Sequence, residues 1–287
     1  MLDQSSPAIE EIPLFKKRGP LRLAFDALID LIYPPRCVLC SLPLDGPSPD
    51  ALPSYEIGIC AACRRLLVTE ESLLCPFCGE FAREPAGNLP RNRFGDQRCD
   101  RRCGQCRNHR MPFERVVTLG PYLGYLRGQI LLMKTEKSGY SAEAMARLLW
   151  ATRQKTFLLA GCDLCVPVPR HYLRRLRRGV NDASFLAREL GRILDIPFDD
   201  NLLRRIRATP PQSQLGRSSR LTNVAGAFAV AARKVKRLAG RRVLLVDDIL
   251  TTGATAGECS RVLKEAGAAE IVVAVCGRAG RNQRFAS

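Results

Sequence analysis

The chain has 287 residues, of which 46% are hydrophobic and 25% charged, and it carries a formal net charge of +17 at pH 7. This length and composition suit a globular protein with one ordinary domain and a small second one. No stretch approaches the roughly 18 consecutive apolar residues of a membrane span, and the N-terminal residues Met1–Phe15 include acidic side chains and no apolar run, unlike a secretory signal. We therefore expect a cytoplasmic protein without a membrane span.

Most of the excess positive charge follows Ala151. A basic balance of this kind favours anionic partners such as nucleotides, phosphates or nucleic acid. A solvated basic surface explains the same charge, so charge alone does not select a partner.

The N-terminal segment contains one predicted helix. Apolar residues recur at helical spacing from Gly19 to Tyr33, and Pro34 and Pro35 end the pattern. We interpret residues 1–36 as a tail and an amphipathic helix that packs on the domain behind it.

Four Cys-x-x-Cys pairs follow this helix. They are Cys37 and Cys40, Cys60 and Cys63, Cys75 and Cys78, and Cys103 and Cys106. Two intervening residues let both thiolates bind one Zn²⁺ ion, and two such pairs complete a tetrahedral structural site. We therefore predict a zinc-binding module over residues 37–110, in which the zinc is structural.

The sequence does not decide which two of these pairs share one zinc ion. Chain order favours the first pair with the second and the third with the fourth, while interleaved pairing is the alternative, and Cys99 can replace Cys103 or stay free. A disulfide framework is typical of shorter, secreted chains, and a redox role is not favoured because none of the four pairs opens a helix after a strand. Cys162 and Cys165 enter a predicted strand, and we interpret them as core residues.

From Glu114 onward, predicted strands and helices alternate. Strands are predicted over 115–123, 163–168, 242–246 and 270–276, and helices over 124–137, 141–157, 182–194 and 255–266. This alternation is typical of an α/β domain with a largely parallel sheet. We therefore predict one such domain over residues 114–287.

The predicted strand over 242–246 leads into the segment with the clearest chemistry. Asp247 and Asp248 follow it, and the hydroxyl-rich segment Thr251–Thr255 comes next. Adjacent carboxylates can accept hydrogen bonds from two neighbouring ribose hydroxyls, and a loop that opens a helix offers N–H groups to a 5′-phosphate. A capped helix alone does not explain two adjacent carboxylates, and a response-regulator receiver needs a later aspartate that residues 249–287 lack. The segment predicts a phosphoribosyl pyrophosphate site.

This segment resembles the signature of type I phosphoribosyltransferases, and two further blocks resemble the ComF family. Val166–Ala183 is similar to the family's Pro-Val-Pro … Arg-Gly-x-Asn segment, and Thr209–Phe228 is similar to its Thr-x-Pro-Gln block. An N-terminal cysteine module is also a feature of the family. The resemblance implies a type I phosphoribosyltransferase fold, an α/β fold with helices beside a largely parallel sheet, preceded by a small zinc-binding module.

The resemblance also implies roles for individual residues. Asp247 and Asp248 would hold the ribose, and together with Lys134 they are the candidate catalytic residues. The residues expected to contact the phosphate and pyrophosphate groups are Thr251, Thr252, Gly253, Ala254, Thr255, Arg170, Arg178, Asn181 and Arg220. The chain departs from the family at Arg177–Asp182, which reads Arg-Arg-Gly-Val-Asn-Asp where the family commonly has Glu-Arg-Gly-Phe-Asn-Gln.

Two functions follow from this resemblance. In the first, the chain is a ComF-like phosphoribosyltransferase that binds phosphoribosyl pyrophosphate with Mg²⁺, transfers the pentosyl group if active, and acts in DNA uptake during natural transformation. In the alternative, it is a non-catalytic protein that retains the fold and binds single-stranded DNA or a competence helicase. Binding to DNA phosphates would weaken steeply as salt rises, which distinguishes it from binding in a closed nucleotide site.

Overall fold

The computed structural model describes residues 33–44, 54–81, 103, 106, 111–136, 138–170, 181–207 and 224–280. The helix predicted over 19–33 lies outside these residues except for its last position, and Cys99, Arg178 and Arg220 also lie outside them. Within the described part of the chain, no helix is long and apolar enough to cross a membrane.

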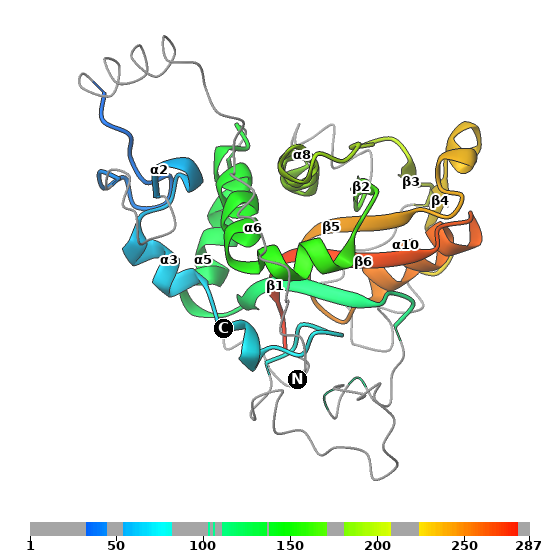
Figure 1. The fold of residues 1–287 in the computed structure, drawn as a ribbon, viewed down its shortest axis with the longest axis horizontal. Helices are drawn as coiled ribbons and strands as arrows, with labels where there is room; N and C mark the ends of the chain where they lie inside the picture. Colours follow the sequence, from blue (N-terminus) through cyan, green and yellow to red (C-terminus); the bar gives the residue numbers. More distant parts are fainter. Residues whose placement is uncertain are drawn as a thin grey trace, which may run out of the picture.

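Four parallel strands form the centre of the fold (Figure 1). In their order across the sheet they are β1 (Arg115–Pro121), β6 (Glu270–Arg278), β5 (Arg242–Leu250) and β2 (Leu164–Pro167). The predicted α/β architecture with a parallel sheet is confirmed. Strand β5 is longer than the predicted 242–246, because Asp247 and Ile249 still pair with β6. The two aspartates therefore lie in the strand itself.

Helices cover both faces of this sheet. They are α5 (Gly124–Met133), α6 (Tyr140–Ala160), α8 (Asp182–Leu194) and α10 (Ala254–Glu265). Leu244 and Val246 of β5 belong to a hydrophobic cluster with α5, α6 and α8, whereas Val243 and Leu245 belong to a cluster with α10. This alternation along one strand explains why the strand reads as a continuous apolar run in the sequence.

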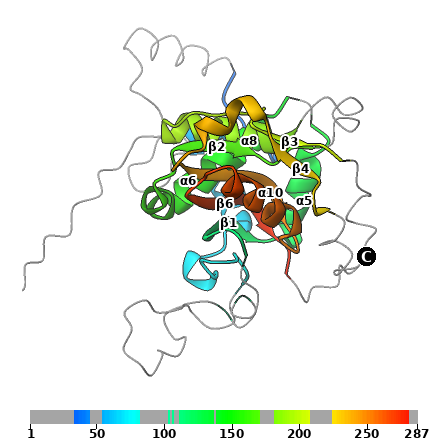
Figure 2. The same cartoon turned by 90° about the vertical axis from the view of Figure 1, so that its right-hand side faces the viewer.

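A small second sheet, which the sequence did not predict, packs on α10. Strands β3 (Leu203–Arg205) and β4 (Phe228–Val230) pair antiparallel, and a 3₁₀ helix, η4 (Ala232–Arg237), follows them. Three-residue strands are too short to show the alternation that identifies a strand from sequence. The end of the molecule that carries β3, β4 and α10 faces the viewer in Figure 2.

The cysteine-rich segments are joined directly to the sheet. Their helical elements are α2 (Ser54–Ile57), α3 (Ala61–Leu67) and the 3₁₀ helix η1 (Glu71–Leu73). Along the outer edge of β1, the Thr69 N–H donates to the Leu119 carbonyl at 2.8 Å, and the Val116 N–H donates to the Pro76 carbonyl at 3.1 Å. These bonds cover an edge strand that would otherwise present free backbone groups.

Candidate functional site

The candidate site lies at the carboxyl end of β5, where ligands of parallel sheets commonly bind. Asp247 and Asp248 project there, and the Asp248 N–H donates to Oδ1 of Asp247 at 2.9 Å. Desolvation by the surrounding protein and the neighbouring charge of Asp248 raise the pKa of Asp247 to about 8. Burial therefore favours the protonated form of Asp247 in the ligand-free protein.

Two cations converge on Asp248 from different elements. Nζ of Lys134, which follows α5, lies 2.9 Å from Oδ2 of Asp248. Nη2 of Arg170, which follows β2, lies 3.3 Å from the same oxygen and 2.5 Å from Oδ2 of Asp182 at the start of α8. Asp182 is buried and was not among the predicted site residues. It gives Arg170 a second carboxylate partner and so fixes the position of that cation.

The loop after β5 turns sharply into α10. We call the segment Thr251–Thr255 the phosphate loop. Gly253 has a left-handed φ of +82°, a conformation that favours glycine, and α10 begins at the next residue. The Ala254 N–H donates to Oγ1 of Thr252 at 3.3 Å. Thr255 and Ala256 in the first turn of this twelve-residue helix line the site, where the partial positive charge of a helix start favours an anion.

The aspartates, the lysine and the phosphate loop line one open cavity of about 200 Å³. Its lining includes Lys134, Asp247, Asp248, Thr251, Gly253 and Thr255. The structure thus brings together residues that the sequence separates by more than a hundred positions, and it places carboxylates, a cation and a helix start in the same hollow. Oxygen donors of this kind also suit Mg²⁺, which proteins bind through carboxylates and substrate phosphates.

Asn181 makes contacts of a different kind. Its Nδ2 donates to the Val168 carbonyl at 3.3 Å and to Oγ of Ser184 at 2.9 Å. These bonds join the end of β2 to the first turn of α8, close to Arg170 and Asp182. Its predicted contact with the pyrophosphate stays a prediction, as do those of Arg178 and Arg220, which lie outside the described residues.

Arg278 is a second residue that sequence reasoning missed. It ends β6, is only 2% exposed, and donates from Nη1 to the carbonyl of Leu250 at 2.8 Å and to that of Thr251. Nη2 lies 3.2 Å from Oε2 of Glu80, two residues after Cys78. An arginine at the end of a strand is usually solvated, so nothing local in the sequence signals that this one holds the start of the phosphate loop.

The cysteines form two groups of four, in which all sulfur atoms lie within 4.8 Å of one another. The first cysteine cluster contains Cys37, Cys40, Cys60 and Cys63, and the second cysteine cluster contains Cys75, Cys78, Cys103 and Cys106. The pairing by chain order is confirmed and the interleaved alternative is wrong. The Cys40–Cys60, Cys75–Cys106 and Cys78–Cys103 sulfur separations are 3.5 to 3.7 Å, far longer than a disulfide bond. They are close to the roughly 3.8 Å edge of a tetrahedron with Zn–S bonds of 2.3 Å.

Cys162 and Cys165 belong to the fold rather than to a metal group. Cys165 is fully buried and lies 3.1 Å from the carbonyl of Ala187, to which its thiol donates. Burial raises the pKa of both thiols, and that of Cys162 reaches about 12. Cys165 is a core residue, as predicted, whereas Cys162 is only partly buried and packs against the core.

Comparison with known proteins adds two kinds of similarity. A family model described as the phosphoribosyl transferase domain matches residues 176–284, which include α8, β3 to β6, the phosphate loop and α10, while β1, β2, α5 and α6 precede the match. The fold is the predicted phosphoribosyltransferase fold, preceded by cysteine clusters that can hold zinc.

Full-length relatives are similar over most of the chain. This chain is 32% identical to competence protein F of Haemophilus influenzae over 219 residues, which are 75% of this chain and 88% of that protein. It is 33% identical to DNA utilization protein YhgH of Escherichia coli over 246 residues, which are 85% of this chain and 96% of that protein. A glutamine phosphoribosylpyrophosphate amidotransferase from B. subtilis superimposes with a TM-score of 0.30 and 20% identity over 53% of this chain and 26% of that chain, a similarity too low to carry an argument.

Proposed function

The chain belongs to the family of competence protein F and DNA utilization protein YhgH, and from that premise we propose that it binds phosphoribosyl pyrophosphate with Mg²⁺ and acts in DNA uptake. The observation that supports this choice of ligand is the cavity at the end of β5. Two adjacent carboxylates, Lys134 and the phosphate loop line the same 200 Å³ hollow, and each matches one part of a phosphorylated ribose.

The two aspartates would accept hydrogen bonds from the neighbouring hydroxyls of the ribose. A pair of adjacent carboxylates suits two adjacent hydroxyl donors. Since Lys134 and Arg170 both contact Asp248 in the ligand-free protein, the ribose would compete with them for this carboxylate. The two displaced cations would then face the diphosphate, which carries the larger negative charge.

The phosphate loop would hold the 5′-phosphate with its N–H and hydroxyl groups. Bound Mg²⁺ would neutralise the diphosphate as a leaving group. In the reaction we propose, the bond between C1 and the diphosphate oxygen breaks, its electron pair leaves with the diphosphate, and a nucleophilic acceptor forms the new bond to C1. The chain's own part is to orient the ribose and stabilise charge, because such a transfer needs no covalent protein intermediate.

A calorimetric titration tests the ligand. Phosphoribosyl pyrophosphate with Mg²⁺ is titrated into the zinc-loaded protein and into the Asp247→Asn/Asp248→Asn double variant. We expect saturable binding to the wild type and a loss of at least about a hundredfold in the double variant, since two ribose contacts are removed. Asp195→Asn is the matched control, because it makes the same chemical change at an exposed residue that ends α8. Absence of binding to the wild-type protein would refute the proposal.

A second function, binding of single-stranded DNA through its phosphates, is favoured by one surface. The sequence from Ala231 to Val246 contains no acidic residue. Within it, Lys234 and Arg237 of η4 pair with buried Asp199, each at 2.5 Å. Arg233, Lys236 and Arg241 are exposed on the same stretch. No aromatic residue interrupts this run, so it suits sequence-neutral contact with phosphates rather than stacking on bases.

The salt dependence of oligothymidylate binding tests this surface. The triple variant Arg233→Ala/Lys236→Ala/Arg241→Ala should bind more weakly, and the slope of log K against log salt should become shallower by about 2. The matched control removes three exposed cations elsewhere, in Arg65→Ala/Arg127→Ala/Lys155→Ala. An equal loss in both triple variants would show that net charge, and not this surface, binds the DNA.

A further inference from the structure

The second cysteine cluster is connected to the phosphate loop through Glu80 and Arg278. Glu80 follows the Cys78–Gly79 turn of the cluster, and its carboxylate lies 3.2 Å from the Arg278 guanidinium. Arg278 is buried, and removing a charge from water is costly unless an opposite charge lies beside it. The position of Glu80 therefore helps to fix the position of Arg278.

Arg278 in turn fixes the backbone from which the phosphate loop starts. Its Nη1 donates to the carbonyls of Leu250 and Thr251, the last residue of β5 and the first of the loop. A guanidinium presents its N–H groups in a rigid plane. Two carbonyls bound to one such plane cannot rotate independently, so the loop enters its turn in a defined direction.

A second segment from the same cluster lies against the tip of the loop. Met111 follows the last cysteine of the cluster, Cys106, by five residues. A Cβ atom at Gly253 would lie 2.7 Å from Cε of Met111, and one at Gly257 would lie 3.5 Å from Cδ of Pro112. The loop is therefore contacted by the segment that follows Cys106 as well as by the residue that Glu80 holds.

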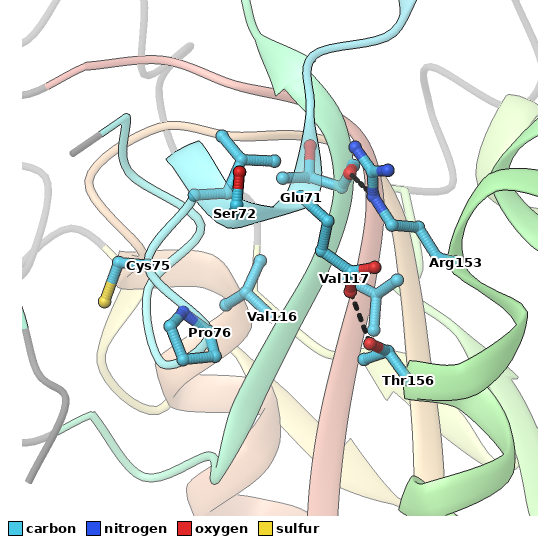
Figure 3. Close-up of a pocket in the computed structure, with 10 residues that line it drawn as sticks. Glu71, Ser72, Cys75, Pro76, Val116, Val117, Arg153 and Thr156 are labelled. Atoms are coloured by element: carbon cyan, nitrogen blue, oxygen red, sulfur yellow. Dashed lines mark hydrogen bonds between the residues drawn. The ribbon is translucent and has the colours of Figure 1, made fainter. Parts of the chain in front are cut away.

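The second cysteine cluster contacts β1 directly and leaves a cavity beside that contact. Cys75 and Pro76 line this cavity of about 220 Å³ together with residues of β1 and α6 (Figure 3). Arg153 and Thr156 of α6 lie across this cavity from the cluster, and Thr156 donates to the carboxylate of Glu71. Since the four cysteines belong to a small hydrophobic cluster of their own, we expect the shape of this unit to depend on the four thiolates being held together by a metal.

We propose that Arg278 is a positioning residue of the phosphate loop and that metal bound at the second cysteine cluster fixes it through Glu80. Metal at this cluster would then set the affinity of the loop for a phosphorylated ligand, while the first cysteine cluster would not. The ligand part of this inference rests on the proposed function, whereas the positioning of the loop does not.

Exchange of Glu80 for glutamine tests the connection, because it removes the charge and keeps the shape. The variant Glu80→Gln should bind ribose 5-phosphate, a probe of the loop, about tenfold more weakly than the wild type in calorimetry. Its zinc content should be unchanged, whereas its thermal unfolding midpoint should fall, because buried Arg278 loses the opposite charge beside it. Glu70→Gln is the matched control, since Glu70 is exposed in the same module and its carboxylate accepts from Ser72. Wild-type affinity in Glu80→Gln would overturn the proposal.

Hydrogen exchange provides a readout that needs no ligand. Amides of residues 250–256 should exchange faster in Glu80→Gln and in the Cys103→Ser variant, which lacks a ligand of the second cluster, but not in Glu70→Gln. Faster exchange together with no ligand binding by the wild type would support the positioning role and refute the proposed function. Unchanged exchange in Glu80→Gln would refute the positioning role, whatever the wild type binds.

Discussion

The first cysteine cluster lies inside the main core, whereas the second lies beside it. Cys37, Cys60 and Cys63 belong to the hydrophobic cluster that α5, α6 and α8 form on the sheet. Cys75, Cys78 and Cys106 instead form a small cluster of their own, together with Phe77 and Cys103. Both clusters offer four thiolates at similar separations. The same set of four thiolates therefore lies inside the main core at the first cluster and beside the main core at the second.

This difference separates two consequences of metal binding. Folding and metal binding are coupled wherever the metal site exists only in the folded chain. At the first cluster, loss of metal would open the core that supports the sheet. At the second cluster, loss of metal would release a unit whose described contacts lead to the edge of β1 and to the phosphate loop. We therefore expect the first cluster to stabilise the fold and the second to support the candidate site.

The largest expected effect comes from replacing a buried ligand of the first cluster. Cys63 is 4% exposed, and its sulfur lies 3.1 Å from the Tyr125 hydroxyl of α5. Cys63→Ser should lower the free energy of unfolding by more than about 4 kcal/mol, because it removes a metal and leaves a poorly packed polar group in the core. Urea unfolding followed by circular dichroism measures this, with zinc content determined on the same sample.

The equivalent change in the second cluster is the control for that prediction. Cys103 is partly exposed and belongs to the small cluster. Cys103→Ser should lower the free energy of unfolding by less than about 2 kcal/mol while one zinc ion per chain is lost. If both variants unfolded with the same loss of stability, the second cluster would be as much a part of the core as the first.

Glycines in the two clusters give the next largest contrast. Gly79 has a φ of +67°, and a Cβ there would lie 2.8 Å from Cγ1 of Val116 in β1. Gly58 has a φ of +80°, but its Cβ would meet Ala144 at an ordinary 3.7 Å. Gly79→Ala should weaken zinc binding at the second cluster by about 2 kcal/mol, from strain plus a clash with a strand that cannot move. Competition with a chelator measures that affinity.

Gly58→Ala is its counterpart in the first cluster. Gly58→Ala should lower the free energy of unfolding by only about 1 kcal/mol through conformational strain, and this loss should be seen in the global unfolding transition. A loss of global stability in Gly79→Ala that exceeded the loss in Gly58→Ala would contradict the view that the second cluster is a separate unit.

The sequence predicted what depends on local spacing. Helix α8 spans the predicted 182–194, and the motif spacing correctly paired the cysteines by chain order. Helix α5 ends at Met133, before the predicted 137, and Lys134 is thereby free to reach Asp248. Lys134 itself was identified by resemblance, since nothing in its neighbours shows that it will meet an aspartate on a distant strand.

What the sequence did not predict depends on contacts between distant segments. Arg278 and Glu80 are separated by nearly two hundred positions, and the burial of each follows from where β6 ends relative to the second cluster. Met111 reads as a linker residue and only the fold places it on Gly253. Asp182 was noted as a departure from the family pattern, but its pairing with Arg170 requires the end of β2 to lie beside the start of α8.

A smaller effect is expected where a hydroxyl touches the first cluster. The Tyr125 hydroxyl lies 3.1 Å from the Cys63 sulfur and would donate to it when the sulfur is a metal-bound thiolate. Burial, followed by the contact with Cys63, raises the pKa of this hydroxyl. Tyr125→Phe should lower the free energy of unfolding by about 1.5 kcal/mol, the value of a hydrogen bond to a charged group. Tyr140→Phe is a control at an exposed tyrosine. If Tyr125→Phe changed the affinity for ligand but not the free energy of unfolding, the first cluster would contribute to the candidate site as well.

The smallest effect is expected when the free energy of unfolding of Asp247→Asn is compared with that of the wild type between pH 7 and pH 9. The pKa of Asp247 is raised from its ordinary value of 3.8 to about 8. A raised pKa contributes stability that is fully present below the unfolded value and is lost as pH rises through the folded value. The wild type should therefore lose stability between pH 4 and pH 8, and Asp247→Asn should not.

From pH 7 to pH 9 the variant should gain about 1 kcal/mol on the wild type, since one pKa unit corresponds to about 1.4 kcal/mol. Urea unfolding of both proteins across this range measures the difference, and parallel curves would mean that Asp247 is ionised in the ligand-free fold. If the variant gains stability relative to the wild type as pH rises, ionised Asp247 destabilises the ligand-free fold, as is common in binding sites. The first cluster is expected to have the opposite effect and to stabilise the fold.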